Sequence, residues 1–220
     1  MSRQRIVVFG AGGFAREVRW LIDEINREHE AYEFVGFAVS DLSKLGEHDS
    51  RNEVVGDVGW LRENRGRFDV LAMGIGSPGP KLRVANALAS DFPPGVWPTL
   101  IHPSVVLDAR SAELGHGVVL CAGVIGTVNV RLAPFAMVNL ACTLGHEASL
   151  GAGCVLNPTV NISGGVTLGE GVLVGTGAQV LQYLKVGDGA TIGAGAVVTR
   201  HVAAGATVVG VPARPLEHKP

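Results

Sequence analysis

The sequence predicts two units, an α/β domain built on a parallel sheet over residues 1–98 and a β-solenoid over residues 99–216. Three observations support this prediction: a strand–glycine turn–helix pattern at the start, a change of composition near residue 97, and a six-residue apolar period in the second half. The chain has 220 residues, which is enough to bury a core in both units.

Composition narrows the class of protein. Hydrophobic residues make up 47% of the chain, aromatic residues 5%, and the net charge is −2. A nucleic-acid-binding protein usually has a basic excess, so we expect no nucleic-acid partner. No apolar run has the length of a membrane span, and the first residues lead into a strand rather than a secretory signal, so we expect a cytoplasmic protein without a membrane partner. The odd number of cysteines, in no metal-like spacing, indicates reduced thiols and no metal.

The first element is a strand followed by a glycine turn and a helix. Residues 6–9 form a continuous apolar run, as a buried parallel strand should. Gly10, Gly12 and Gly13 form the turn, Ala15 completes a G-x-G-x-x-A pattern, and apolar residues then recur at helical spacing up to Ile25.

Two further strands are predicted over residues 34–39 and 70–73. In a parallel sheet the carboxyl ends of such strands meet at one edge, where ligands bind. We therefore expect substrate contacts at that edge, from Gly10, Gly12, Gly13, Phe14, Ser40, Asp41, Gly76 and Lys81. The unit is about half of a full dinucleotide fold, which favours a nucleotide-diphospho-sugar over a nicotinamide dinucleotide. Tight strand–helix packing without a ligand is the remaining interpretation.

Residues 92–98, which read FPPGVWP, mark the junction between the units. Beyond them, every sixth residue from Val106 to Val208 is apolar and mostly small, and an aliphatic-Gly pair often lies four positions earlier. This period suits short strands joined by tight turns, with three hexads to a triangular coil of 18 residues. The unbroken period predicts no inserted loop between residues 106 and 208.

Several segments together resemble one family. They are the hexad unit, Gly10 to Ala15, Ile101 to Ser104, Leu144 to Glu147, and the ending from Ile192 to Leu216 with Gly-Val-Pro-Ala-Arg at its close. The chain resembles the sugar acetyltransferases that join an N-terminal Rossmann-like domain to a C-terminal left-handed parallel β-helix. The resemblance implies that the β-helix is left-handed, that the protein is a homotrimer, and that acetyl-CoA is the co-substrate. Members acetylate UDP-linked bacillosamine precursors, dTDP-linked 4-amino sugars, GDP-perosamine or sialic acid, and GDP-perosamine is the acceptor that the resemblance favours.

The resemblance also assigns roles at the candidate site. It implies that His146 is a general base and that Glu147 orients it. The 18-residue spacing stacks Gly164 beside His146, where its N–H would bind the thioester oxygen as the family pattern also implies; the alternative is that Gly164 and Gly165 only turn a corner. His116 occupies the same slot of its hexad without an adjacent acid, so a histidine there can be incidental. Asn139 and Asn157 are also one coil apart; they form either a structural ladder or, for Asn139, a substrate contact.

Coenzyme contacts are expected along the later coils. The resemblance implies them at Gly164, Gly175, Ala178, Ala194, Ala196, Pro212 and Arg214. Arg214 is suited to a phosphate of the coenzyme. The plainer interpretation is that Pro212 ends the last coil and Arg214 is solvated.

The expected reaction is transfer of an acetyl group from acetyl-CoA to the amino group of a nucleotide-linked 4-amino-4,6-dideoxy sugar. We expect direct attack in a ternary complex between subunits, because no cysteine has a His–acid pair beside it in the sequence. The alternatives are a sialic-acid-type O-acetyltransferase, a non-catalytic nucleotide-sugar-binding module, and a metal-dependent hydratase. The hydratase needs three converging histidines, whereas His116 and His146 are 30 residues apart, which is not a multiple of 18.

Overall fold

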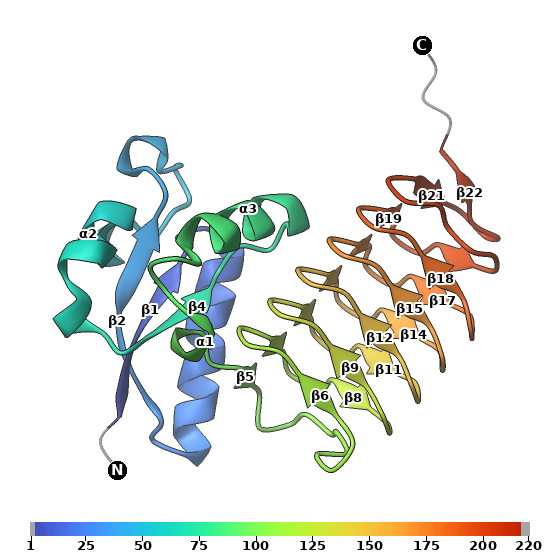
Figure 1. Cartoon of the computed structure of the whole chain (residues 1–220), viewed down its shortest axis with the longest axis horizontal. Coiled ribbons are helices and arrows are strands. Elements are labelled where there is room, and N and C mark those ends of the chain that lie inside the picture. The colour runs from blue at the N-terminus through green and yellow to red at the C-terminus, as the bar shows by residue number, and fades with distance from the viewer. Residues whose placement is uncertain (1–2, 217–220) are drawn as a thin grey trace.

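The computed structural model of the chain describes residues 3–216. It has an α/β part at the N-terminal end and a stack of triangular coils at the C-terminal end (Figure 1). The predicted fold class, a Rossmann-like parallel sheet followed by a left-handed parallel β-helix, is confirmed. None of the helices in the described part of the chain is long and apolar enough to cross a bilayer.

The N-terminal sheet, sheet A, has four parallel strands in the order β3-β2-β1-β4. The strands are β1 (Gln4–Phe9), β2 (Tyr32–Val39), β3 (Val54–Asp57) and β4 (Val70–Met73). Sequence reasoning missed β3, because only its first two residues are aliphatic and no alternation marks it.

Helices cover both faces of sheet A. Ile6 and Val8 pack against α1 (Gly13–Glu28), whereas Val7 and Phe9 face α2 (Val58–Glu63) and α3 (Pro78–Leu88). Four short 3-10 turns connect these elements: η1 (Leu42–Lys44), η2 (Arg51–Glu53), η3 (Arg65–Arg67) and η4 (Pro94–Val96). The carboxyl ends of β1, β2 and β4 therefore lie at one edge of the sheet in this three-layer domain.

The coils form three further sheets. Sheet B contains β5 (Leu100–Ile101), β7 (Val119–Leu120), β10 (Met137–Val138), β13 (Val155–Leu156), β16 (Leu173–Val174), β19 (Thr191–Ile192), β21 (Thr207–Val209) and the antiparallel β22 (Arg214–Pro215). Sheet C contains β8 (Ile125–Gly126), β11 (Thr143–Leu144), β14 (Asn161–Ile162), β17 (Gln179–Val180) and β20 (Val197–Val198). Sheet D contains β6 (Glu113–Leu114), β9 (Arg131–Leu132), β12 (Ser149–Leu150), β15 (Thr167–Leu168) and β18 (Lys185–Val186).

The chain runs from sheet B to C to D in every coil, and the four residues between successive strands form a corner. We call these the B–C corner (139–142 and its equivalents), the C–D corner (145–148) and the D–B corner (151–154). In each corner between residues 115 and 196, one residue has a left-handed backbone, with φ between 54° and 74°, and glycine often fills that slot. The small apolar residue that follows points into a continuous core.

The 18-residue coil is observed through the middle of the stack, where Thr143 pairs with Asn161 and Leu144 with Ile162. The prediction of an unbroken period is wrong at both ends. The first coil has an extra residue, since Leu100 pairs with Val119, and Val106 is 62% exposed. The last coil is two residues shorter, since Ile192 pairs with Val208. The sequence hides both shifts, because the residues that take the inward positions are also apolar.

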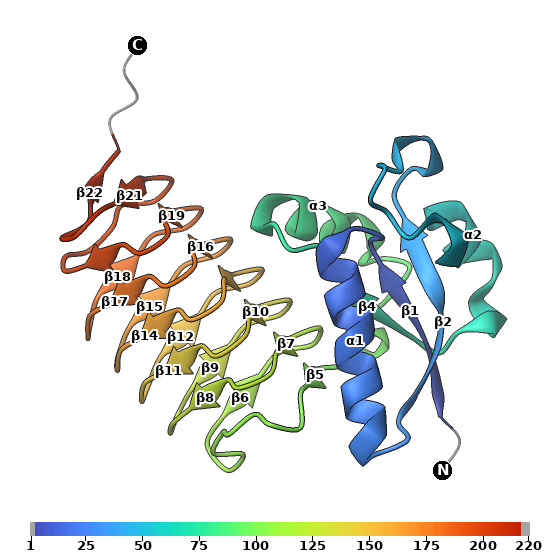
Figure 2. The ribbon, with the colours of Figure 1, turned by 180° about the vertical axis from the view of Figure 1, so that it is seen from behind.

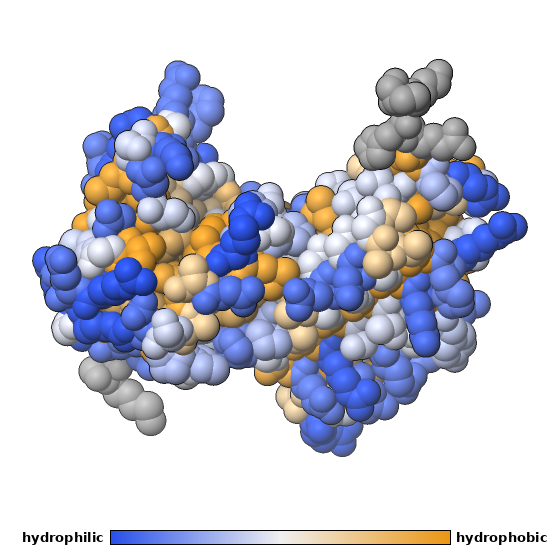
Figure 3. Space-filling view, turned by 45° about the horizontal axis from the view of Figure 1, so that its top comes forward, coloured by the Kyte–Doolittle hydropathy of each residue, from blue (hydrophilic) through white to orange (hydrophobic). Residues whose placement is uncertain are grey.

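The α/β domain packs on sheet B. Side chains of α1 share a core with the outward residues Val119, Met137 and Val155 of that sheet, and α1 lies beside the first coils (Figure 2). Figure 3 shows hydrophobic residues (orange) extending from this domain to the first coils. The domain therefore packs on sheet B from β5 to β16 and shares no core cluster with the outward residues of sheets C and D.

Lys81 lies in this interface and not at the strand-end edge. Its side chain is 2% exposed, and its Nζ donates a hydrogen bond of 3.0 Å to the backbone oxygen of Phe135. Burial lowers the pKa of Lys81 to about 7. The expectation that Lys81 binds substrate is wrong, because the first turn of α3 directs it toward the coils.

Candidate functional site

His146 and Glu147 lie at the C–D corner directly after β11. Gly145 precedes them, and a Cβ on Gly145 would lie 2.5 Å from the nitrogen of Gly164 in the next coil. The two coils therefore approach closely at this corner. His146 points outward, and about half of its side chain is exposed.

The hydrogen bond between His146 and Glu147 sets the tautomer of the imidazole. Nδ1 contacts Oε2 of Glu147, and a carboxylate can only accept, so Nδ1 carries the proton. Asn129, one coil earlier, donates to Oε1 of the same carboxylate at 3.2 Å. The bonds from His146 and Asn129 lower the pKa of Glu147. Nε2 of the neutral imidazole is therefore free to accept a proton.

Gly164 lies beneath the imidazole. A Cβ on Gly164 would collide with Nε2 and Cε1 of His146, so only glycine fits under the ring in this position. Within residues 3–216 the N–H of Gly164 has no hydrogen-bond acceptor, whereas its carbonyl accepts from the N–H of Tyr183 at 2.9 Å. A free backbone donor thus lies next to a proton-accepting nitrogen.

Sequence reasoning missed Tyr183, which lies at the same corner. Its ring covers Gly165, and the ring centroid is 6.4 Å from that of His146. The 18-residue spacing could have found it, because Glu147, Gly165 and Tyr183 occupy one slot in three successive coils.

His116 lies at a D–B corner, apart from His146. Its ring packs edge-on against Phe135, and partial burial lowers its pKa. No three His, Cys, Asp or Glu side chains within residues 3–216 form a group that could hold a metal ion.

The cysteines are poor nucleophiles in this fold. All three are buried, and burial raises the pKa of Cys121 to about 12 and that of Cys142 and Cys154 to about 11.

A second cluster lies at the strand-end edge of sheet A. A cavity of about 230 Å³ is lined there by Phe9, Gly10, Val39, Ser40, Asp41, Lys44, Leu45, Asp49 and Ile75. Gly10 has φ 120°, and a Cβ on it would lie 2.8 Å from the oxygen of Gly74, so the turn needs glycine. The fold thus brings Gly10, Ser40 and Asp41 together.

The polar groups of this cavity are partly engaged with one another. Asp41 accepts from the hydroxyl and the N–H of Ser43 and forms an ion pair of 3.3 Å with Lys44. These contacts, the Ser43 hydrogen bonds foremost, lower the pKa of Asp41. Lys44 and Asp49 were missed because they lie in an irregular loop after β2 that no periodicity marks.

Other expected substrate residues flank this cavity without lining it. Gly12 precedes α1, and a Cβ on it would lie 3.4 Å from Asp49 Oδ1. Gly13 is exposed at the start of α1, and Phe14 lies against Gly76. The helix begins here with no acidic residue in its first turn.

The expected coenzyme residues are divided between corners. Gly164 is at the C–D corner with His146, whereas Gly175 and Ala194 stack at the B–C corner. Ala178 and Ala196 are 0% exposed, so their assignment as contact residues is wrong: they fill the inward slot after the corner.

Asn139 also begins a B–C corner. It is nearly buried, and its Oδ1 accepts from the N–H of Leu140 at 2.8 Å. It therefore lies on a different corner of the coil from His146.

The end of the stack holds a cavity of about 320 Å³. It is lined by Val198, Arg200, His201, Val202, Ala203, Ala206, Val208, Ala213, Arg214 and Pro215. Arg214 is exposed and Pro212 lies outside the lining. Arg200, a second cation that sequence reasoning missed, lies on the C–D side, in line with His146 along the stack.

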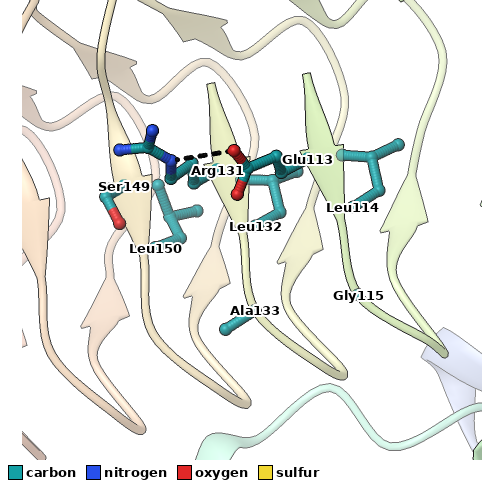
Figure 4. Close-up of a pocket in the computed structure, with 8 residues that line it drawn as sticks. All are labelled: Glu113, Leu114, Gly115, Arg131, Leu132, Ala133, Ser149 and Leu150. Atoms are coloured by element: carbon teal, nitrogen blue, oxygen red, sulfur yellow. Dashed lines mark ion pairs between the residues drawn. The ribbon is translucent and has the colours of Figure 1, made fainter. Parts of the chain in front are cut away.

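A cavity of about 330 Å³ on sheet D has fewer polar side chains available to bind a ligand (Figure 4). Its two charged lining residues, Glu113 and Arg131, form an ion pair of 3.3 Å. The rest of the lining is Leu114, Gly115, Leu132, Ala133, Ser149 and Leu150. The two charges in this cavity therefore neutralise each other.

Comparison with known proteins places these features in context. A family model described as bacterial transferase hexapeptide (six repeats) matches residues 165–200. A comparison with curated proteins gave no match.

Three solved structures are similar over nearly the whole chain. The acetyltransferase domain of PglB from Neisseria gonorrhoeae is 30% identical, with 97% of this chain and 100% of that chain covered and a TM-score of 0.82. A mutant of perosamine N-acetyltransferase from Caulobacter crescentus, in complex with CoA and GDP-perosamine, is 27% identical, with 99% of both chains covered and a TM-score of 0.84. WeeI from Acinetobacter baumannii is 27% identical, with 96% of this chain and 99% of that chain covered and a TM-score of 0.79.

Proposed function

The chain belongs to the hexapeptide-repeat family of nucleotide-sugar N-acetyltransferases, and from this premise we propose that it transfers an acetyl group from acetyl-CoA to an amino sugar. The proposed acceptor is the amino group of a nucleotide-linked 4-amino-4,6-dideoxy sugar of the GDP-perosamine type. The similar perosamine N-acetyltransferase binds CoA and GDP-perosamine, which supports both co-substrates.

One observation carries the chemistry: Nε2 of His146 lies against Gly164, whose backbone N–H has no acceptor within the described residues. In the proposed reaction the sugar amine attacks the thioester carbonyl while Nε2 takes a proton from the amine. The N–H of Gly164 donates to the oxygen as it becomes negative, and Glu147 stabilises the imidazolium that forms. The thiolate of CoA leaves, and the amide remains on the sugar.

The position of His146 favours an active site between subunits. We propose that the nucleotide binds in the strand-end cavity of sheet A, which we call the nucleotide cavity. It belongs to a domain that packs on sheet B, and the C–D corner is the one corner of the coil that does not adjoin sheet B. Within one chain, therefore, the coil stands between the two halves of the proposed site.

The three faces of the coil differ in a way that favours one trimer geometry. The α/β domain packs on sheet B from β5 to β16, and sheet D carries Glu113, Arg131 and Lys185 on its outer side. The outward residues of sheet C are uncharged: Ile125, Thr143, Asn161, Gln179 and Val197. We propose that sheet C faces the threefold axis, since a free face without charge is the one suited to burial.

Packing of sheet C around the axis would bring together His146 and the nucleotide cavity, which lie on opposite sides of the coil in a single chain. The C–D and B–C corners are the two edges of sheet C, so packing around the axis places the C–D corner of one subunit beside the B–C corner of the next. His146 then faces a neighbour's Asn139 and its α/β domain. Acetyl-CoA would lie in the cleft between these corners, in reach of Gly175 and Ala194.

The length of the stack suits the coenzyme. Arg200 follows His146 by 54 residues, or three coils, which corresponds to about 14 Å at the usual strand spacing. With the thioester at Gly164, the pantetheine arm would run along the corner and the phosphates would reach Arg200 and Arg214.

A thiol-release assay tests the proposal. Acetyl-CoA is mixed with a panel of UDP-, dTDP- and GDP-linked amino sugars, and we expect turnover with a 4-amino-4,6-dideoxy sugar, most efficiently with the GDP-linked one. Absence of turnover with every member would overturn the proposed activity. Turnover confined to another nucleotide would overturn only the choice of guanine.

The His146→Ala variant separates amine from hydroxyl acceptors. A neutral amine is a good nucleophile without help, whereas a hydroxyl needs a base. A loss below about tenfold in kcat indicates attack by a neutral amine, and a loss of about a thousandfold or more indicates a hydroxyl or a base-dependent amine. Assaying both acceptor types with the variant decides between them.

A further inference from the structure

Tyr183 combines a left-handed backbone with an exposed aromatic ring. Its φ is 60°, and 66% of the residue is exposed. A bulky side chain rarely adopts this region, and glycine fills the same slot in most other corners of the stack. A tyrosine in this conformation must therefore be held by something that compensates its conformational cost.

Three of the other left-handed residues, Phe135, Asn129 and Glu147, have partners within the chain. Phe135 is 8% exposed and packs edge-on against Trp97. The side chain of Asn129 donates a hydrogen bond to Glu147, and Glu147 in turn accepts from His146. Tyr183 differs from Phe135, the other aromatic residue in this conformation, because its ring has no comparable enclosure in the chain.

The ring has a defined place along the corner. It covers Gly165, its own N–H donates to the carbonyl of Gly164, and its centroid is 6.4 Å from that of His146. Tyr183 lies one coil beyond Gly164 and one coil before Arg200. The ring thus stands between the proposed thioester position and the proposed phosphate position.

We propose that the face of the Tyr183 ring is the wall against which the pantetheine arm of CoA packs, next to the thioester. The inference rests on the proposed function, because the two ends of the coenzyme are placed by it. An aromatic face suits a chain of methylene and amide groups, and packing there holds the thioester carbonyl over the N–H of Gly164. The phenol hydroxyl is not needed for this role.

The test measures binding as well as activity. CoA affinity is measured by calorimetry for the wild type, Tyr183→Gly and Tyr183→Phe. Adenosine 3′,5′-diphosphate, which has the adenosine and two of the three phosphates of CoA but no pantetheine arm, serves as the second probe. We expect Tyr183→Gly to weaken CoA binding about tenfold and raise the KM for acetyl-CoA by a similar factor. Tyr183→Phe should bind CoA within about twofold of the wild type, and no variant should change affinity for the diphosphate.

Stability and assembly separate this role from a structural one. Glycine accepts the left-handed backbone without cost, so Tyr183→Gly should unfold at the same temperature as the wild type or higher. Its mass by sedimentation should equal that of the wild type. A drop in unfolding temperature or loss of the oligomer would overturn the inference, because the ring would then pack on protein.

The two proposals fail in different ways. If wild-type protein neither binds CoA nor turns over acetyl-CoA, the proposed function itself fails. If the wild type binds CoA and Tyr183→Gly binds it equally well, only the role of Tyr183 is overturned. Equal losses in Tyr183→Gly and Tyr183→Phe would overturn it too, since they would assign the effect to the hydroxyl.

Discussion

At the scale of single residues, the imidazole of His146 restricts what can stand beneath it. Gly164→Ala would place a methyl group where the ring now lies, and the ring must rotate away. The backbone of Gly164 is not left-handed, so the protein should fold normally. We expect kcat/KM to fall about a hundredfold with little change in unfolding temperature. A variant with wild-type kinetics would show that the observed ring position is not the reactive one.

Glu147 can be tested by removing its charge alone. Its lowered pKa means that it is ionised throughout the neutral range. Glutamine keeps the shape but cannot stabilise an imidazolium, so Glu147→Gln should lower kcat about tenfold. Glu113→Gln, the same change at an exposed acid on sheet D, is the matched control and should leave kcat unchanged. Equal rates for both variants would remove Glu147 from the mechanism.

At the scale of elements, the sequence predicted the stacking of the repeated coils but missed features of the irregular loop and of the domain interface. The hexad period placed His146 and Gly164 in adjacent coils, because an 18-residue repeat determines stacking. It missed Lys44 and Asp49, which lie in a loop, and misplaced Lys81, because the direction of α3 depends on how two domains pack. It also predicted coenzyme contacts for Ala178 and Ala196, which are buried, because a small residue suits both a core position and a coenzyme contact.

Because Lys81 is buried between α3 and the coils, we expect the free energy of unfolding to depend on pH. The pKa of Lys81 is about 7 in the folded protein against 10.5 as its ordinary value, so between these pH values the unfolded chain binds the extra proton. Stability should therefore rise with pH across that window, and the full cost of burying the charge applies below pH 7.

Lys81→Met removes this titration. The variant should be more stable than the wild type by a few kcal/mol below pH 7, and the difference should shrink as pH rises toward 10.5. At the top of the window the order should reverse, because the oxygen of Phe135 has lost its donor. Denaturant unfolding of both proteins at several pH values measures the difference, and a gap independent of pH would refute the assignment.

At the scale of the whole molecule, two defective chains should repair each other if the site lies between subunits. Gly164→Ala displaces the imidazole of His146 at the C–D corner, and Asp41→Ala lacks a polar group of the proposed nucleotide cavity on the opposite side of the coil. In trimers assembled at random from equal amounts, about a quarter of the sites would combine an intact corner from one chain with an intact cavity from the next. Co-expression of the two variants should therefore restore about a quarter of wild-type activity, although each variant alone is nearly inactive. Mixing them after assembly, without exchange of subunits, is the control and should restore none. If the base and the nucleotide cavity of one site came from the same chain, no mixed trimer would hold an intact site, and co-expression would give no more than the average of the two parents.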